Sequence, residues 1–380
     1  MKKSLIFVLA VFLTLFVTAC SPGSNIDASD DADSQEEKVF TIGAVAPLTG
    51  EGAVYGLPEQ RTVDLGVKEL NARWAAEGKK QRLELIVEDG KCNGKDGLTA
   101  AQTLVNLKGV KVIYGGLCSS ETLGLAPFAE ENAVLVFSSM SSSPEITNSG
   151  DYIFRNYPSD TAQVDVMSAY INEQGHKRVA IISENNDYAQ ALRKGYQAAF
   201  ETMGIEVVAD EVTAQNAKDV RSELLKIKEA KPDALVILPQ TIPMGEIYIK
   251  QIRESGIDVP VYSNEVATLD EALDAFGDLL EGVITPQGVF DDANPEYQRV
   301  IAEADCNLGL YCATIYDAVF ILGDVVEECG DEDTECMRDK LYKTKNWQGL
   351  SGTVSFDKNG DVGGNFEVLQ VRDGQLVPIT

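Results

Sequence analysis

Apolar and polar positions follow a repeating pattern along this chain from about residue 40 onward. Short runs of aliphatic and β-branched residues, such as Phe40–Pro47 and Ala234–Leu238, alternate with longer stretches in which apolar residues recur at helical spacing. In the stretch Pro58–Ala76, for example, Val63 and Val67 would lie on one face of a helix. Unbroken apolar strands between amphipathic helices predict parallel sheets that are covered by helices on both faces.

The alternation occurs in two blocks, and each block predicts one doubly wound parallel-sheet lobe of an α/β protein. The predicted strands are Phe40–Pro47, Leu83–Glu88, Val110–Tyr114, Val134–Phe137, Arg178–Ile182, Val207–Asp210, Ala234–Leu238 and Val259–Tyr262. The predicted helices are Pro58–Ala76, Gly97–Leu107, Leu123–Asn132, Ala162–Glu173, Ala189–Met203, Val220–Glu229 and Gly245–Ser255. Residues 296–342 are predicted to be mainly helical, and Gly352–Arg372 to form a hairpin around Asp357–Gly360.

The N-terminus predicts export. Met1–Lys3 is basic, and Leu5–Val17 is an apolar run too short to span a bilayer comfortably. Residues 1–20 end in Val17-Thr18-Ala19-Cys20, which resembles a lipoprotein signal whose Cys20 is lipidated after cleavage. An ordinary signal peptide and an uncleaved anchor are the alternatives. Residues 21–38 hold almost no large apolar side chain, so we expect a flexible acidic tether with a reach of roughly 25 Å.

Charge and length restrict the partners and the domain count. Acidic residues outnumber basic ones 60 to 32, for a formal net charge of −28, which argues against nucleic acid and anionic lipid as partners. About 340 residues follow the tether, which suits two domains. We expect a monomer on the outer side of the cell membrane or in the periplasm, in contact with a membrane through its lipid anchor only.

Six cysteines remain when Cys20 is set aside, and an even number in an exported chain predicts three disulfides. The nearest partners would be Cys92–Cys118, Cys306–Cys312 and Cys329–Cys336. Six cysteines allow fifteen connectivities, so spacing alone gives only a preference for these pairs. A metal site is the competing interpretation, but there is no Cys-x-x-Cys pair and His176 is the one histidine in the chain. We expect neither a metal nor a cofactor.

Loops that follow the predicted strands are the place to look for function, because ligands of open parallel sheets bind outside the carboxyl ends of the strands. These loops are Leu48–Gly56, Gly115–Ser120, Ser138–Pro144, Ser183–Tyr188, Pro239–Pro243 and Ser263–Ala267. They are rich in Ser, Thr, Tyr, Gly and Asn and include one acid that we expect to be buried, Glu265. Hydroxyls, free backbone N–H groups and helix N-termini suit an anionic group on a small ligand.

Three of these segments carry a resemblance to a known family. Gly43–Gly56, Gly115–Ser120 and Val136–Thr147 resemble the type I periplasmic solute-binding proteins, and in particular the branched-chain amino-acid (Leu/Ile/Val) binding components of ABC importers. The resemblance extends in the same order through Phe154-Arg155, Asn186-Asp187-Tyr188, Tyr316 and Gly352–Asp361. It covers essentially the whole chain after the tether.

The resemblance implies a periplasmic-binding-protein-like fold of two lobes joined by a hinge of three crossovers. Lobe one would comprise 39–158 with 287–364, and lobe two 159–286 with 365–380. We place the crossovers near Tyr157–Asp160, Thr285–Gly288 and Gly363–Phe366. The ligand would bind in the cleft between the lobes, and closure would follow.

It also implies a set of ligand-binding residues. In the family, hydroxyls at the positions of Ser119 and Ser142 hold the ligand carboxylate, with the backbone of Met140 and Ser141 beside them. An acid at the position of Glu265 pairs with the ammonium group. Aromatic residues bracket the ligand at the positions of Tyr55, Tyr188 and Tyr316, and a disulfide joins the positions of Cys92 and Cys118. Thr241 stands where relatives carry another tyrosine, which leaves room for a larger or more polar ligand.

The function implied is delivery of an amino acid to the permease of an ABC importer, without enzymatic activity. A sensory binding module for a receptor and an extracellular hydrolase are the alternatives, although one histidine gives a Ser–His–Asp site little support. Amides, urea, short peptides and aromatic acids are alternative ligands. The Gly50–Gly56 segment has the spacing G-x-G-x-x-x-G, which does not match the dinucleotide-binding fingerprint.

Overall fold

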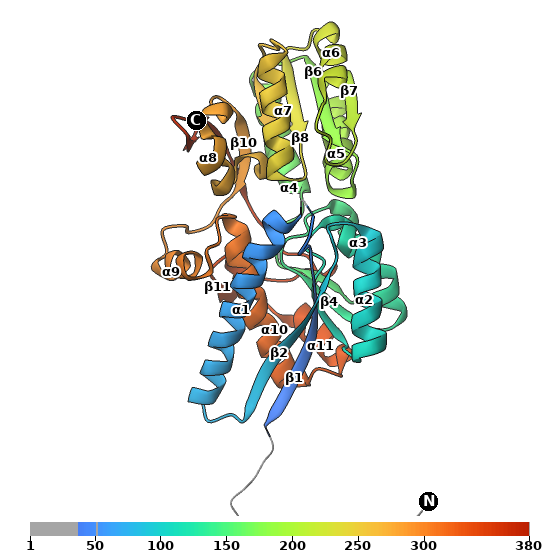
Figure 1. The fold of residues 1–380 in the computed structure, drawn as a ribbon, viewed down its shortest axis with the longest axis vertical. Helices are drawn as coiled ribbons and strands as arrows, with labels where there is room; N and C mark the ends of the chain where they lie inside the picture. Colours follow the sequence, from blue (N-terminus) through green and yellow to red (C-terminus); the bar gives the residue numbers. More distant parts are fainter. Residues whose placement is uncertain (1–36, 51, 380) are drawn as a thin grey trace, which may run out of the picture. The chain divides into compact units, whose positions relative to one another are not determined.

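The computed structural model describes residues 37–50 and 52–379, and the predicted signal, Cys20 and nearly all of the predicted tether lie outside them. The described chain forms two large sheets and a small two-stranded one (Figure 1). The first large sheet has the order β2-β1-β3-β4-β5, and all of its strand pairs are parallel. Its strands are β1 (Lys38–Ala46), β2 (Gln81–Asp89), β3 (Val112–Gly115), β4 (Leu135–Ser138) and β5 (Ile153–Arg155).

The second large sheet has the order β14-β13-β10-β9-β8-β6-β7. Its strands are β6 (Arg178–Glu184), β7 (Glu206–Thr213), β8 (Ala234–Leu238), β9 (Val261–Ser263), β10 (Ile284–Gly288), β13 (Phe366–Arg372) and β14 (Gln375–Pro378). Five of these strands are parallel, and β13 and β14 add an antiparallel edge. The central strands β6 and β8 are almost entirely buried, as their unbroken apolar runs predicted.

Helices cover both sheets, and each predicted helix is present. The first part of the chain forms α1 (Ala53–Ala76), α2 (Gly94–Lys108), α3 (Ser119–Glu131) and the short helix η1 (Pro144–Asn148). The second part forms α4 (Thr161–Glu173), α5 (Asp187–Met203), α6 (Arg221–Ala230), α7 (Ile242–Glu254), η2 (Glu265–Thr268), α8 (Asp270–Phe276) and η3 (Gly277–Leu280). Three further helices, α9 (Pro295–Ala304), α10 (Leu310–Cys329) and α11 (Thr334–Lys343), follow β10, and α10 packs along α1 (Figure 1).

The chain passes three times between the two large sheets. The first passage lies between β5 and α4, since α4 packs against β10 and β13. The second lies between β10 and α9, which packs against α1. The third directly precedes β13. Our placement of the second passage at Thr285–Gly288 was wrong, because pairing with β13 continues β10 through these residues.

The predicted hairpin over Gly352–Arg372 was also wrong as a unit. Its turn exists, and a single bridge joins Phe356 to Val362 around it. Its two arms pair elsewhere: β12 (Gly352–Val354) pairs with β11 (Trp347–Gly349), whereas β13 joins β10 in the second large sheet. Alternation of polarity along a segment identifies a strand but not its partner, so the local pattern could not distinguish these arrangements.

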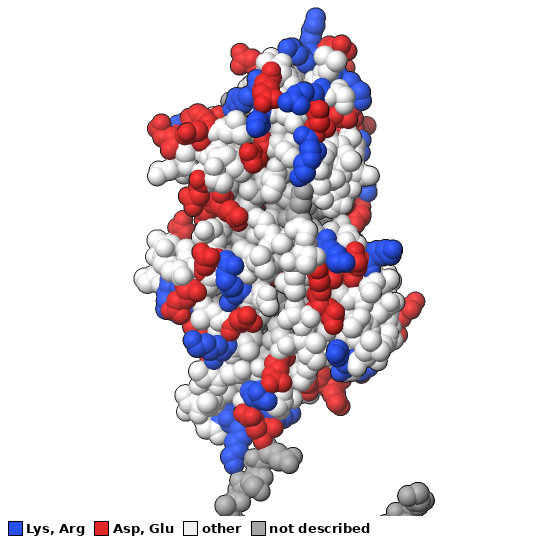
Figure 2. Space-filling view, viewed as in Figure 1, with Lys and Arg blue, Asp and Glu red and all other residues white. Residues whose placement is uncertain are grey.

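Three disulfides join the pairs that spacing favoured. Cys92–Cys118, Cys306–Cys312 and Cys329–Cys336 have Cα–Cα distances of 5.2, 6.1 and 5.7 Å, within the usual range for a disulfide. The connectivity predicted from nearest neighbours is therefore confirmed. Among the described helices, none has the length and apolar content to cross a bilayer. Acidic and basic side chains are interspersed on the face drawn in Figure 2, and acidic ones gather around α8.

Candidate functional site

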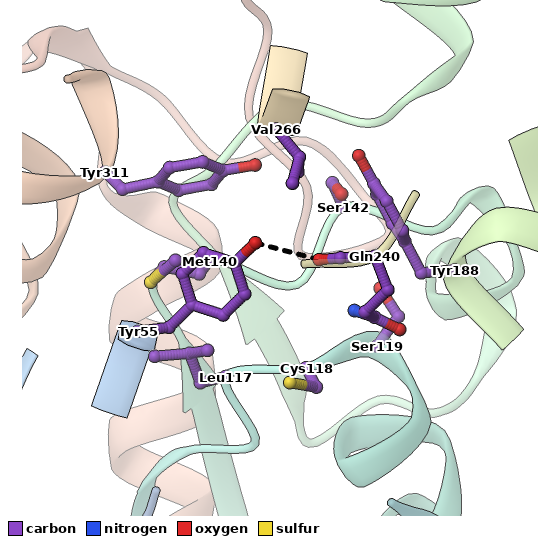
Figure 3. Close-up of a pocket in the computed structure, with 10 residues that line it drawn as sticks. All are labelled: Tyr55, Leu117, Cys118, Ser119, Met140, Ser142, Tyr188, Gln240, Val266 and Tyr311. Carbon is purple, nitrogen blue, oxygen red and sulfur yellow. Dashed lines mark hydrogen bonds between the residues drawn. The ribbon is translucent and has the colours of Figure 1, made fainter. Parts of the chain in front are cut away.

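A pocket lies at the carboxyl ends of strands from both large sheets, where the strand order predicted it (Figure 3). The atom-free space around it is about 330 Å³, a figure that includes solvent at its mouth. Its walls combine apolar, aromatic and hydroxyl side chains and contain neither Lys nor Arg. The lining residues are Tyr55, Leu117, Cys118, Ser119, Met140, Ser142, Tyr188, Gln240, Val266 and Tyr311.

Four of these ten residues stand in the first turn of an α-helix. Ser119 is the first residue of α3, Tyr188 and Tyr311 are the second residues of α5 and α10, and Tyr55 is the third residue of α1. Gln240 lies immediately before the residue that caps α7. The first N–H groups of a helix lack partners within it and carry partial positive charge. The pocket therefore offers electrostatic stabilisation to an anionic group without a cationic side chain.

Hydrogen bonds hold the start of α3, around Ser119, in place. Glu121 accepts hydrogen bonds from the backbone N–H groups of Cys118 at 3.0 Å and Cys92 at 2.9 Å, which joins both half-cystines to one carboxyl. Burial raises the pKa of Glu121 to about 7, and these N–H donors act against that rise. The Ser119 hydroxyl accepts a hydrogen bond from the Ser143 N–H at 3.2 Å. Its own hydrogen can still be donated to a ligand.

The serine loop after β4 has mixed roles. Met140 and Ser142 line the pocket, as the resemblance implied, but the Ser142 hydroxyl donates to Asp160 at 3.0 Å. The Ser141 side chain faces the scaffold instead, where its hydroxyl donates to the carbonyl oxygen of Gly116. In this arrangement Ser119 is the hydroxyl free to donate, and Ser142 is oriented toward an acid.

A buried arginine stabilises the same loop from behind. Arg155 has a fully buried side chain and donates to Asp361 at 2.7 Å and to the carbonyl oxygen of Ser143 at 2.8 Å. Because Asp361 belongs to the turn that precedes the third passage between the sheets, Arg155 links the serine loop to that passage. A charge buried this completely needs these partners to be tolerated.

Two buried acids stand behind the pocket wall without lining it: Glu265 contacts Tyr311, and Asp160 contacts Ser142. Glu265 accepts hydrogen bonds from the hydroxyls of Tyr157 at 2.6 Å and Tyr311 at 2.5 Å, and these two rings stack with centroids 4.4 Å apart. Burial raises the pKa of Glu265 to about 7. Burial, followed by repulsion from Glu265, raises the pKa of Asp160 to about 8. A cation placed between them would favour ionisation of both carboxyls.

Two residues expected at the site lie elsewhere. Tyr316 does not line the pocket: its hydroxyl donates to Glu69 on α1 and its ring packs against Phe320. Five residues along a helix correspond to a rotation of about 140°, so Tyr311 and Tyr316 face different directions, and Tyr311 reaches the pocket. Thr241 likewise does not line it; its hydroxyl caps α7 by accepting from Met244 N–H at 3.4 Å.

Sequence reasoning also missed four residues that matter here. Tyr157 and Asp160 follow β5, a strand of three residues that is too short to show a pattern. Tyr311 lies in α10, which is apolar around most of its circumference and so gives no sign of which tyrosine faces the pocket. Gln240 was inside a loop that we identified, but the resemblance directed attention to the residue after it. Among the described residues, no group of three or more His, Cys, Asp or Glu side chains could hold a metal ion.

Comparison with known proteins identifies the family of the chain. The model of a family described as periplasmic binding protein matches residues 39–375. The "Leucine-, isoleucine-, valine-, threonine-, and alanine-binding protein" of Pseudomonas aeruginosa is 25% identical over 335 residues, which cover 87% of this chain and 88% of the relative.

Solved structures share the fold. The branched-chain amino acid transporter substrate binding protein LivJ of Streptococcus pneumoniae, in complex with isoleucine, has a TM-score of 0.78 at 24% identity, covering 89% of this chain and 98% of that one. A solute binding protein of an ABC transporter from R. palustris, in complex with 4-hydroxybenzoate, has a TM-score of 0.80 at 19% identity, covering 90% and 96%. The chain therefore belongs to the periplasmic binding proteins, an extracytoplasmic family of solute-binding proteins that are not enzymes.

Proposed function

We propose that this protein captures a free amino acid and presents it to the permease of an ABC importer. The observation that carries the proposal is the pairing of opposite electrostatic environments in one pocket. Ser119 at the N-terminus of α3 lines the pocket, and the buried acids Asp160 and Glu265 hydrogen-bond to two other lining residues, Ser142 and Tyr311. A zwitterion carries the two charges that these environments complement.

The carboxylate end would bind at the start of α3. The Ser119 hydroxyl and the first N–H groups of α3 are suitable donors, and the helix dipole adds favourable potential. The disulfide Cys92–Cys118 and the Glu121 carboxyl hold this corner in place before the ligand arrives. Donors that are already positioned lose little entropy on binding.

The ammonium end would bind near Glu265 and Asp160. Glu265 already accepts two tyrosine hydroxyls, but an ionised carboxylate has about four acceptor positions. The Tyr188 hydroxyl is a further neutral partner: burial and the charges of Asp160 and Glu265 raise the pKa of Tyr188 well above its ordinary value, so it keeps its proton. The ligand side chain would then contact Leu117, Met140 and Val266.

The two large sheets would act as lobes that close on the ligand. We propose 39–158 with 289–364 and 159–288 with 365–380 as the lobes, because β10 extends through Gly288, and we place the hinge at the three passages between the sheets. Because ligand contacts come from residues on both sides of that hinge, binding would favour the closed arrangement. Cys20 is proposed as the lipid attachment, and the tether would hold the folded part near the membrane.

Aromatic carboxylates are the second candidate ligands. The pocket contains three tyrosine rings, and a structural neighbour was solved with 4-hydroxybenzoate. The carboxylate of such an acid would bind to Ser119 and the first N–H groups of α3, but the ligand would supply no cation to Glu265 and Asp160. Beside an uncharged ring these carboxyls would stay protonated and gain no ion pair, whereas an ammonium group would favour their ionised forms, which is why we prefer the amino acid.

The test is titration calorimetry with amino acids and with benzoate, on the native protein and on Glu265→Gln. We expect the substitution to weaken amino-acid binding by about 1.5–3 kcal/mol, because a charge-assisted hydrogen bond is lost. The exposed Glu246→Gln makes the same charge change on α7 and should have no effect. Unchanged amino-acid affinity in Glu265→Gln would refute the ammonium assignment. Benzoate binding that tightens in this variant would favour the aromatic class.

A further inference from the structure

The side chain of Gln240 enters the pocket with an unused hydrogen-bonding atom. The residue is 7% exposed and lines the pocket, and its Oε1 is buried with no hydrogen-bond partner. Figure 3 shows its carboxamide directed toward the Ser119 side of the pocket. Of the buried side-chain atoms without a partner in the described part of the chain, this is the one that belongs to a lining residue.

The backbone of Gln240 is fixed from both sides. Its carbonyl oxygen accepts the hydroxyl of Tyr55 at 2.8 Å, and its N–H donates to Glu184 at 2.5 Å. Gln240 also lies two residues after the end of β8 and directly before Thr241, the capping residue of α7. The carboxamide is therefore presented to the pocket by a rigid support and has little freedom to find a partner elsewhere.

An amide buried without a partner is unfavourable, and native proteins pair nearly all such groups. In a binding pocket the missing partner can come from the ligand. In the proposed function, the ligand ammonium pairs with Asp160 and Glu265. The ligand carboxylate binds to Ser119 and the first N–H groups of α3. The nearby carboxylate cannot donate to Oε1, which is itself an acceptor, so a donor on the ligand side chain is the partner available for Gln240.

We propose that Gln240 is a specificity-determining residue that selects amino acids with a hydroxyl or carboxamide in the side chain over purely hydrocarbon ones. The inference rests on the proposed amino-acid function and names the class of ligand within it. A hydroxyl supplies the donor that Oε1 lacks, and a carboxamide supplies both a donor and an acceptor. A ligand of the same shape but without a polar side-chain group would bind less tightly, because it would leave the buried amide of Gln240 without a hydrogen-bond partner.

The experiment compares two pairs of ligands that match in shape: threonine with valine, and asparagine with leucine. Affinities are measured by titration calorimetry on the native full-length protein and on two variants. Gln240→Met replaces the carboxamide by a side chain of similar length that has no strong hydrogen-bonding group. Gln174→Met makes the same change at the surface and is the control. On the native protein and the control, we expect the polar member of each pair to bind roughly tenfold or more tightly. In Gln240→Met both ratios should fall to about one, with valine and leucine unchanged or improved.

The outcomes separate this inference from the function beneath it. If none of the four amino acids binds the native protein, both the proposed function and the inference fail. If they bind but valine and leucine match or exceed their polar partners, only the inference fails. If Gln240→Met weakens all four equally, Gln240 contacts a group that all amino acids share, and the assignment to the side chain is wrong. The native ratios give a result even if Gln240→Met does not fold.

Discussion

The hydroxyl of Tyr55, near the start of α1, donates a hydrogen bond to the main-chain oxygen of Gln240, just past the end of β8, over 2.8 Å. This contact joins a helix packed on the first large sheet to a strand end of the second, across the wall of the ligand pocket. It is buried, and burial raises the pKa of Tyr55 well above its ordinary value, so the hydroxyl remains a donor at any physiological pH. The arrangement of the pocket thus depends partly on this bond.

Tyr55→Phe removes this bond and keeps the ring. A buried hydrogen bond contributes about 0.5–1.5 kcal/mol, so we expect ligand affinity to fall roughly threefold to tenfold. Titration calorimetry measures the affinity. Small-angle X-ray scattering should show a larger radius of gyration for the variant than for the native protein when ligand is absent. An unaltered radius together with unaltered affinity would show that this contact does not help to hold the sheets together.

Stability without ligand should decrease as the pH rises. The pKa values of Asp160 and Glu265 are raised to about 8 and about 7 by burial, so the folded protein holds protons that the unfolded chain releases. Groups shifted in this direction contribute stability that is complete below the unfolded pKa near 4 and is lost as the pH rises toward 8. We expect the melting temperature to decline between pH 5 and pH 8.

Asp160→Asn should flatten that decline, because an amide does not titrate. Asp165→Asn serves as the control, since Asp165 is exposed on α4, the helix that Asp160 directly precedes, and undergoes the same chemical change. The general repulsion expected from a net charge of −28 affects both variants alike. Parallel curves for the two variants, measured by differential scanning calorimetry, would rule out Asp160 as a source of the pH dependence.

Asp361→Asn should be strongly destabilising. Arg155 is fully buried and would lose its charged partner, which typically costs about 3–5 kcal/mol in the free energy of unfolding. The comparison is Asp339→Asn, which breaks the pair between Arg338 and Asp339, whose side chains are 25% and 55% exposed. We expect less than about 1 kcal/mol there. Urea denaturation followed by circular dichroism measures both, and similar small losses would contradict the role assigned to Arg155.

Helix starts show how far the sequence could position the site. Periodicity placed the beginnings of α1, α3 and α5 at Pro58, Leu123 and Ala189, whereas they begin at Ala53, Ser119 and Asp187. The first turns, which the prediction left out, lie at the pocket. Their side chains therefore do not form an apolar stripe and carry little periodic signal. The residues expected in loops, Tyr55 and Ser119 among them, therefore stand on the helix N-termini.

The sequence by itself determined the succession of strands and helices, the three disulfide pairs and the edge of the sheets where a ligand could bind. These follow from local periodicity, from the spacing of cysteines and from the rule that parallel strands present their carboxyl ends together. Only the tertiary structure decided that Tyr311 rather than Tyr316 reaches the pocket, that β13 joins β10, and that Gln240 is left with an unpaired atom. The reason is physical: partners of a strand and orientations around a buried helix are fixed by packing between segments distant in the chain, which no local pattern records.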